Sequence, residues 1–272
     1  MLRAADVSFS YRPLAAPVLS GVSLDVPANG FVGILGPNGS GKTTLLRLLA
    51  GTRQPSRGKV LLDDVDLARV GRAVVARRMA VVPQDTHLAF DFTALEVVLM
   101  GRYPHLSAFE IEGPSDIAIA RDALAATGTL ALEDRLFDTL SGGERQRVVI
   151  AAALAQISGA DNKAGVLLLD EPTAALDLAY QLEVASLLRD LHQRTQIAVV
   201  VSTHDLNFAA GLCQTLVLLK DGVVIAAGPT ADVLTAGNIR TLYGVEADVQ
   251  VNAGAGHIVV VPLRRIPSGP RT

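Results

Sequence analysis

The stretch that decides the fold is Gly36-Pro37-Asn38-Gly39-Ser40-Gly41-Lys42-Thr43, which fits the pattern G-x-x-x-x-G-K-T of a phosphate-binding loop. A continuous apolar run, Phe31 to Leu35, precedes it and predicts a buried strand. Helix-forming residues from Thr44 to Ala50 follow it. Because the motif requires this order of strand, loop and helix, the sequence predicts a nucleotide-binding loop.

The residue types of this loop suit phosphate binding. Glycines let backbone N–H groups wrap the phosphates, and the amino terminus of the following helix adds positive potential. Lys42 is expected to reach the β and γ phosphates of ATP, and the Thr43 hydroxyl to ligate Mg²⁺. The expected nucleotide contacts are Gly36, Pro37, Asn38, Gly39, Ser40, Gly41, Lys42, Thr43 and Thr44.

Two acidic residues end a second buried strand. The run Val166 to Leu169 is followed by Asp170 and Glu171, and open α/β sheets place their ligand-contacting residues at such strand ends. Two acids that merely end a strand are the alternative. Beside a phosphate-binding loop, we expect Asp170 to help hold Mg²⁺ and Glu171 to polarise the attacking water as general base.

A third motif, Leu140-Ser141-Gly142-Gly143-Glu144, precedes a predicted helix. Ser141 and Glu144 fit the S-x-x-E capping box, which is a purely structural explanation. A cap alone does not require Gly142 and Gly143, because glycine weakens the first turn of a helix. We therefore expect an anion to bind at this helix end.

Hydrophobic periodicity predicts an α/β fold. Period-2 alternation in Leu2–Tyr11 and Val18–Val26 indicates an opening antiparallel β subdomain, whereas the apolar run Ile197–Val201 indicates another buried strand of a parallel sheet. Helical spacing between about residues 86 and 160 predicts an inserted helical subdomain. The fold class is thus a P-loop NTPase core, a mostly parallel sheet flanked by helices, with these two subdomains.

The expected division is a nucleotide-binding domain, residues 1–228, and a carboxy-terminal extension, residues 229–272. Within the nucleotide-binding domain, Asp161–Gly165 is predicted to form a surface loop. The extension should contain a short helix and a hairpin that turns around Ala253-Gly254-Ala255-Gly256.

Composition excludes several classes of protein. The 272 residues are 50% hydrophobic, enough for a sizeable core, and the net charge of −3 with interspersed signs argues against a nucleic-acid partner. The single cysteine, Cys213, excludes an internal disulfide. The first residues lack the apolar stretch of a secretory signal, and no apolar run approaches the roughly 20 residues of a membrane span. Any membrane role is therefore expected to need a partner.

From about Leu2 to Gly228 the sequence resembles the ABC ATPase family, in which Leu140–Glu144 matches the signature motif. The order of the motifs matches as well. The resemblance implies a Q-loop glutamine at Gln84 and a D-loop at Ala175-Leu176-Asp177, with Ala175 where many relatives carry Ser. It also implies a switch histidine at His204.

The same resemblance assigns roles to residues in the motifs. It implies that Tyr11 stacks on adenine, although a core position for Tyr11 and a structural role for His204 are the alternatives. It implies catalytic roles for Glu171, His204 and Gln84, and Mg²⁺ ligation by Thr43, Gln84 and Asp170. Further ATP contacts are expected from Ser141, Gly142, Gly143, Glu144 and Asp177.

The helical segment and the tail point to one group of transporters. Gly101-Arg102-Tyr103-Pro104-His105 and the tail from Gly228 to Pro262 resemble the importer ATPases for iron-siderophore, haem and cobalamin. This implies a head-to-tail dimer of the chain, permease subunits, an indirect extracytoplasmic binding protein, and a peripheral place on the cytoplasmic face of the membrane. Non-transport ABC ATPases of repair or translation, and a regulatory module that only binds ATP, remain the alternatives.

Overall fold

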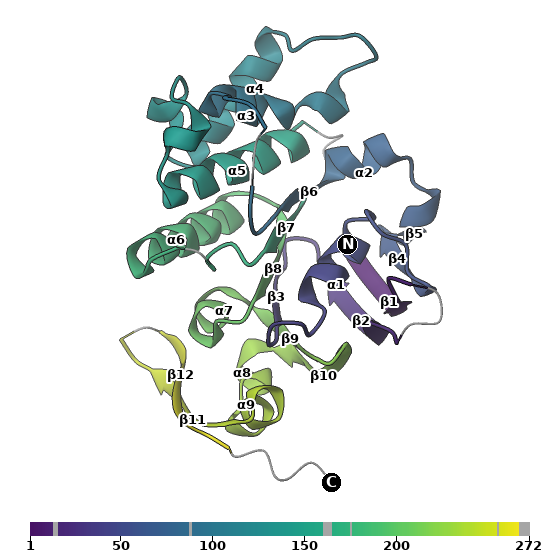
Figure 1. The fold of residues 1–272 in the computed structure, drawn as a ribbon, viewed down its shortest axis with the longest axis vertical. Helices are drawn as coiled ribbons and strands as arrows, with labels where there is room; N and C mark the ends of the chain where they lie inside the picture. The colour runs from purple at the N-terminus through teal and green to yellow at the C-terminus, as the bar shows by residue number, and fades with distance from the viewer. Residues whose placement is uncertain (13–15, 87–88, 160–164, 175, 255, 267–272) are drawn as a thin grey trace. The chain divides into compact units, whose positions relative to one another are not determined.

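The computed structural model describes residues 1–12, 16–86, 89–159, 165–174, 176–254 and 256–266 (Figure 1). These residues form two compact units. Unit 1 combines Met1–Asp66 with Val200–Thr272, and unit 2 is Leu67–Val199. Strand β8 (Ala198–Thr203) begins at the end of unit 2 and continues into unit 1.

Unit 1 opens with an antiparallel sheet in the order β2-β1-β4-β5. These strands are β1 (Leu2–Phe9), β2 (Leu19–Val26), β4 (Arg57–Leu62) and β5 (Val65–Asp66). Leu2 lies opposite Val26 and Val7 opposite Val22, and all four side chains are buried. The predicted antiparallel subdomain is therefore confirmed, and β4 and β5 are strands that periodicity did not predict.

The second sheet of unit 1 has the strand order β10-β9-β3-β8. It contains β3 (Phe31–Leu35), β8, β9 (Thr215–Lys220) and β10 (Val223–Pro229). Strands β3 and β9 run parallel, and β10 is antiparallel to β9. Every residue of β3 and β8 is buried, as their continuous apolar runs predicted. Helix α1 (Lys42–Leu49) follows β3, and α7 (Leu206–Leu212) follows β8.

In the described carboxy-terminal part of unit 1, up to residue 266, two helices precede a hairpin. Helices α8 (Thr230–Val233) and α9 (Ala236–Tyr243) precede the antiparallel pair β11 (Val245–Asn252) and β12 (His257–Arg265). The expected hairpin is present, although Ala255 of its expected turn lies outside the described residues. In Figure 1 the hairpin is the yellow-green and yellow ribbon, and its strand β12 packs against α7.

Unit 2 combines two parallel strands, β6 (Met79–Val82) and β7 (Val166–Asp170), with helices. The helices are α2 (Arg72–Arg78), α3 (Ala94–Met100), α4 (Pro114–Ala126), α5 (Gly142–Ile157) and α6 (Leu178–Arg194). Single 3₁₀ turns are η1 (Leu67–Arg69), η2 (Tyr103–His105), η3 (Leu130–Leu132) and η4 (Phe137–Thr139).

Helices α3, α4 and α5 pack on one another and appear in blue-teal shades in Figure 1. They confirm the predicted helical segment. Of the expected surface loop, residues 161–164 lie outside the described part of the chain. None of the helices within the described ranges is both long enough and apolar enough to cross a membrane.

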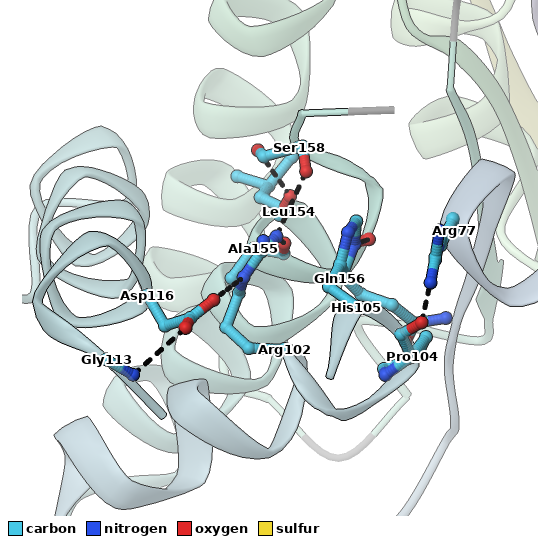
Figure 2. A network of polar contacts seen from close by, with 10 residues as sticks. All are labelled: Arg77, Arg102, Pro104, His105, Gly113, Asp116, Leu154, Ala155, Gln156 and Ser158. Carbon is cyan, nitrogen blue, oxygen red and sulfur yellow. Dashed lines mark hydrogen bonds and ion pairs between the residues drawn. The ribbon is translucent and has the colours of Figure 1, made fainter. Parts of the chain in front are cut away.

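A buried arginine joins three elements of this helical part (Figure 2). Arg102 Nε donates to Asp116 Oδ1 at 3.0 Å, and its Nη1 donates to the carbonyl oxygens of Ala155 at 2.7 Å and Ser158 at 3.0 Å. Asp116 Oδ2 in turn accepts from the Gly113 N–H at 3.1 Å, which caps the start of α4. The Arg102 guanidinium lowers the pKa of Asp116 through this hydrogen bond.

Neighbouring polar side chains extend the same network. Gln156 Nε2 donates to the carbonyl oxygens of Ala76 at 2.8 Å and Met79 at 2.9 Å, which ties α5 to the end of α2 and the start of β6. His105 Nε2 lies 2.7 Å from the Gln156 carbonyl oxygen and donates to it. Arg77 Nε donates to the Pro104 carbonyl oxygen at 2.7 Å. The Gly-Arg-x-Pro-His element is therefore the hydrogen-bonded junction of α2, η2, α4 and α5.

Candidate nucleotide site

The predicted phosphate-binding loop turns from β3 into α1, and two kinds of constraint require its glycines. Gly39 and Gly41 adopt positive φ values of 80° and 106°, which L side chains rarely adopt. A Cβ at Gly36 would lie 2.2 Å from the Leu219 carbonyl oxygen of β9. The loop can therefore follow this path against its own sheet only with glycine at these positions.

Lys42 and Ser40 place polar groups inside the loop. Lys42 is 4% exposed, and its Nζ donates to the carbonyl oxygens of Gly36 at 2.9 Å and Pro37 at 3.2 Å. The Ser40 hydroxyl oxygen is buried, and among the described residues it has no hydrogen-bond partner. A buried polar group without a partner is costly, and phosphate oxygens would satisfy both this hydroxyl and the ammonium. The loop thus fits the triphosphate of ATP.

Tyr11 lies beside this loop in unit 1. Its hydroxyl is 3.0 Å from Thr44 Oγ1 of α1, and its ring meets the edge of Phe9 with centroids 5.0 Å apart. Tyr11 is 50% exposed, so it is not the buried core residue of the alternative interpretation. An exposed aromatic face beside a phosphate loop suits stacking on a base, and the adenine contact stays a prediction.

His204 follows β8 directly, and its segment is tied to the loop. The Gly36 N–H donates to the Thr203 carbonyl oxygen at 3.3 Å, so the start of the loop and the residue before His204 are neighbours within unit 1. Asp205 caps α7 by accepting from the N–H groups of Asn207 and Phe208 at 2.8 and 3.0 Å. The His204 side chain is exposed between these two fixed points.

The acidic pair lies in unit 2, at the end of β7. Asp170 is the last residue of the strand and is 8% exposed. Glu171 has a left-handed backbone with φ 47°, which is costly for a residue with a side chain and is concentrated at functional sites. The backbone therefore turns sharply between the two carboxylates.

Three predicted motifs meet around one cavity of unit 2. The cavity has a volume of about 230 Å³. Its lining includes Gln84 after β6, Gly142 at the start of α5, Glu171 after β7, and Leu176. The structure thus brings the Q-loop, the signature motif and the proposed base together. Lys42, Thr43 and His204 belong to unit 1.

The signature motif forms the predicted capping box. Ser141 Oγ accepts from the Glu144 N–H at 3.3 Å, and Glu144 Oε2 accepts from the Ser141 N–H at 2.7 Å. These hydrogen bonds lower the pKa of Glu144, the backbone bond contributing most. A Cβ at Gly143 would lie 2.3 Å from the Tyr180 ring, whereas one at Gly142 would meet Leu176 at an ordinary 3.4 Å. Internal packing therefore explains Gly143 without the anion that the sequence suggested.

The D-loop residue Asp177 has a structural role in α6. Its Oδ1 accepts from the Tyr180 N–H at 3.1 Å and so caps the helix. Ala175, which the family pattern places in the same loop, lies outside the described residues. The nucleotide contact expected of Asp177 remains a prediction.

The loop, the acid-terminated strand and the surrounding sheet define a P-loop ATPase. The family model described as "ABC transporter" matches residues 19–174, more than half of the chain. A second model, described as an AAA domain, matches only residues 139–210. The chain belongs to the ABC transporter family, as an ATP-binding subunit that couples ATP hydrolysis to transport.

Curated relatives include importer subunits. The haemin import ATP-binding protein HmuV of Bordetella pertussis is 44% identical over 86% of this chain and 89% of its own length. The cobalamin import ATP-binding protein BtuD of Halobacterium salinarum is 42% identical over 90% of this chain and 60% of its own length. FepC of Escherichia coli, a ferric enterobactin transport ATP-binding protein, is 36% identical over 97% and 94%. The predicted likeness to this importer group is confirmed, against the repair and translation alternatives.

Solved structures show the same fold. An inward-facing conformation of an ABC transporter assigned to the metal-chelate type gives a TM-score of 0.82 at 31% identity and covers 97% of both chains. The dimeric structure of the bacterial ABC transporter cassette MJ0796 gives 0.70 at 28% identity and covers 85% of this chain and 99% of its own. The predicted fold class is therefore confirmed.

Proposed function

We propose that this chain powers the import of haem, cobalamin or a ferric siderophore from the cytoplasmic face of the cell membrane. Two copies would work with permease subunits and, indirectly, with an extracytoplasmic binding protein. The relatives and the sequence pattern of Gly101–His105 support this group. Uptake of labelled haem, ferric siderophore and cobalamin by vesicles holding the complete transporter tests it. No ATP-dependent uptake of any of the three would refute the proposed import.

The observation that carries nucleotide binding is the buried Lys42 ammonium in the same loop as the Ser40 hydroxyl, which has no hydrogen-bond partner among the described residues. When ATP binds, Lys42 exchanges its contacts with the Gly36 and Pro37 carbonyl oxygens for contacts with phosphate oxygens. The phosphate oxygens accept stronger, charge-assisted hydrogen bonds. Lys42→Ala should therefore weaken nucleotide binding, as measured by titration with a fluorescent ATP analogue. Unchanged affinity would contradict this role.

Thr43, Asp170 and Gln84 would hold Mg²⁺ through oxygen atoms, the ligands that this ion prefers. When bound with ATP, the ion neutralises charge that develops on the phosphates. The chain itself supplies Glu171, which accepts a proton from the attacking water, and His204, which contacts the γ-phosphate. Glu171 follows Asp170 with a left-handed backbone, φ 47°.

The working site is proposed to be shared between two copies, with ATP held by the loop of one and covered by Ser141–Gly143 of the other. The dimeric form of a solved cassette supports this arrangement. Heterodimers isolated with two tags test it. A Lys42→Ala subunit paired with a Gly142→Asp subunit keeps one intact shared site, whereas a doubly mutated subunit paired with wild type keeps none. Higher ATPase activity of the second heterodimer would refute sharing.

The permease is proposed to dock on Gln84 and the helical segment to His105, together with the adjoining loop that follows η2. Tyr103, Phe109 and Ile111 are 57%, 106% and 81% exposed, and Tyr103 and Ile111 line a surface pocket with Glu110. Exposed apolar side chains grouped in this way suit a protein partner. Crosslinks from the purified complex should concentrate here, and crosslinks confined to the carboxy-terminal hairpin would contradict the proposal.

A further inference from the structure

The segment that carries His204 is held by the carboxy-terminal extension, of which the structure describes residues 229–254 and 256–266. The Tyr243 hydroxyl, at the end of α9, donates to the His204 carbonyl oxygen at 3.1 Å. Gly244, with φ 67° and ψ 33°, then turns the chain from α9 into β11. The extension therefore contacts the backbone of the proposed switch histidine directly.

The hairpin of the extension is hydrogen-bonded to α7, the helix that follows His204. Asn207 Nδ2 donates to the Val260 carbonyl oxygen at 3.1 Å, and Asn207 Oδ1 accepts from the Val260 N–H at 2.8 Å. One turn later, a Cβ at Gly211 would lie only 3.3 Å from His257 Nε2. Positions 207 and 211 lie on one face of α7, so this face lies along β12.

The extension is itself anchored to the core of unit 1, which makes it a fixed support. Ile239 and Leu242 of α9 are 0% and 2% exposed, and Val260 of β12 is 2% exposed. Lys220 Nζ of β9 donates to the Thr241 carbonyl oxygen at 2.6 Å. These contacts hold the side chains of α9 at a fixed position relative to the sheet from which the phosphate loop begins.

We propose that Tyr243 is a positioning residue for ATP hydrolysis, and that the extension sets the orientation of His204 through it. The inference rests on the proposed contact of His204 with the γ-phosphate. The Tyr243 bond holds the carbonyl of His204 while Asn207 holds the next helix, so the backbone on both sides of the imidazole is fixed. Small misplacements of a catalytic group have large effects on rate, and His204 itself is exposed.

The test uses the full-length chain and the variant Tyr243→Phe, which removes only the hydroxyl and keeps the ring of α9. We expect kcat for ATP hydrolysis to fall between about 2- and 12-fold, the range for loss of one hydrogen bond. KM for ATP should stay unchanged, because no contact of the phosphate loop is altered. Thr241→Val is the matched control: it also removes a hydroxyl bond of α9, the one to the Gly237 carbonyl oxygen, without touching His204.

Several outcomes overturn the inference. They are an unchanged kcat for Tyr243→Phe, an equal loss in Thr241→Val, or a loss that appears in KM rather than in kcat. Equal losses would mean that α9 stability alone is responsible. The variant His204→Ala, measured in parallel, distinguishes the proposed catalytic role of His204 from its positioning by Tyr243. Wild-type ATPase activity of His204→Ala refutes the catalytic role. An inactive His204→Ala beside a fully active Tyr243→Phe refutes only the positioning.

Discussion

Removal of the buried arginine of unit 2 should destabilise the protein far more than removal of an exposed one nearby. The perturbation is Arg102→Ala. The Arg102 side chain is 6% exposed and that of its partner Asp116 12%, so neither charge is well solvated. The substitution leaves the Asp116 carboxylate unpaired and takes the donor away from the carbonyl oxygens of Ala155 and Ser158.

The expected loss in the free energy of unfolding follows from the contacts that Arg102→Ala removes. Two hydrogen bonds from a charged donor contribute about 1.5 kcal/mol each. Breaking one side of a buried ion pair costs about 3 to 5 kcal/mol in all, and the residual exposure of Asp116 favours the lower end. With a urea m-value of about 2 kcal/mol/M, the unfolding midpoint should fall by about 1.5 M.

Urea unfolding followed by circular dichroism measures this shift, with Arg77→Ala as the matched control. Arg77 is exposed and donates one hydrogen bond, to the Pro104 carbonyl oxygen, so its loss should cost less than about 1 kcal/mol. An Arg102→Ala midpoint within 0.3 M of the Arg77→Ala midpoint, on the order of 0.6 kcal/mol at that m-value, would refute the reasoning. The hydrogen-bond network of Arg102 would then contribute no more to the free energy of unfolding than the single bond of the exposed Arg77 does.

Three further outcomes are expected. Glu171→Gln should retain ATP binding and lose ATPase activity by about 10²- to 10⁴-fold, and a residual rate above about a tenth would rule it out as the base. Burial, followed by the positive charges of Arg102 and Arg77, lowers the pKa of His105 despite its carbonyl bond and the Asp116 charge. The unfolded chain then binds more protons than the folded one just below pH ~6.5, so the urea midpoint should fall as pH falls through this range, and His105→Gln should flatten that dependence. Gly143→Ala should lower the melting temperature because of Tyr180, whereas Gly142→Ala should not, and equal melting would contradict the packing explanation.

The parts of the fold that the sequence predicted are those in which local pattern and chemistry coincide. The phosphate loop requires a strand before it and a helix after it, and Phe31–Leu35 and α1 occupy those places. Buried strands such as β7 show as continuous apolar runs because both of their faces are covered. The sequence also predicted the S-x-x-E cap of α5, because its two hydrogen bonds join residues that are close in sequence.

The parts that remained unpredicted depend on partners distant in sequence. The bond from Tyr243 to His204 spans 39 residues, and those from Arg102 to Ala155 and Ser158 span 53 and 56. No periodicity within a window of one helix or strand signals such contacts. The motif Gly-Arg-x-Pro-His identified Arg102 as part of an element, but only the folded chain shows which groups it meets.

The carbonyl oxygens at the end of α5 require a hydrogen-bond donor at position 102. A buried ion pair alone can often be replaced by apolar residues of similar volume without loss of stability. Here such a replacement would leave the carbonyl oxygens of Ala155 and Ser158 without the donor that satisfies them. Helix α5 contains 16 residues and begins at the Ser141 capping box, so it spans about 24 Å between two polar caps. Because both ends are fixed by hydrogen bonds, the helix that presents the signature motif is held as a rigid body within unit 2.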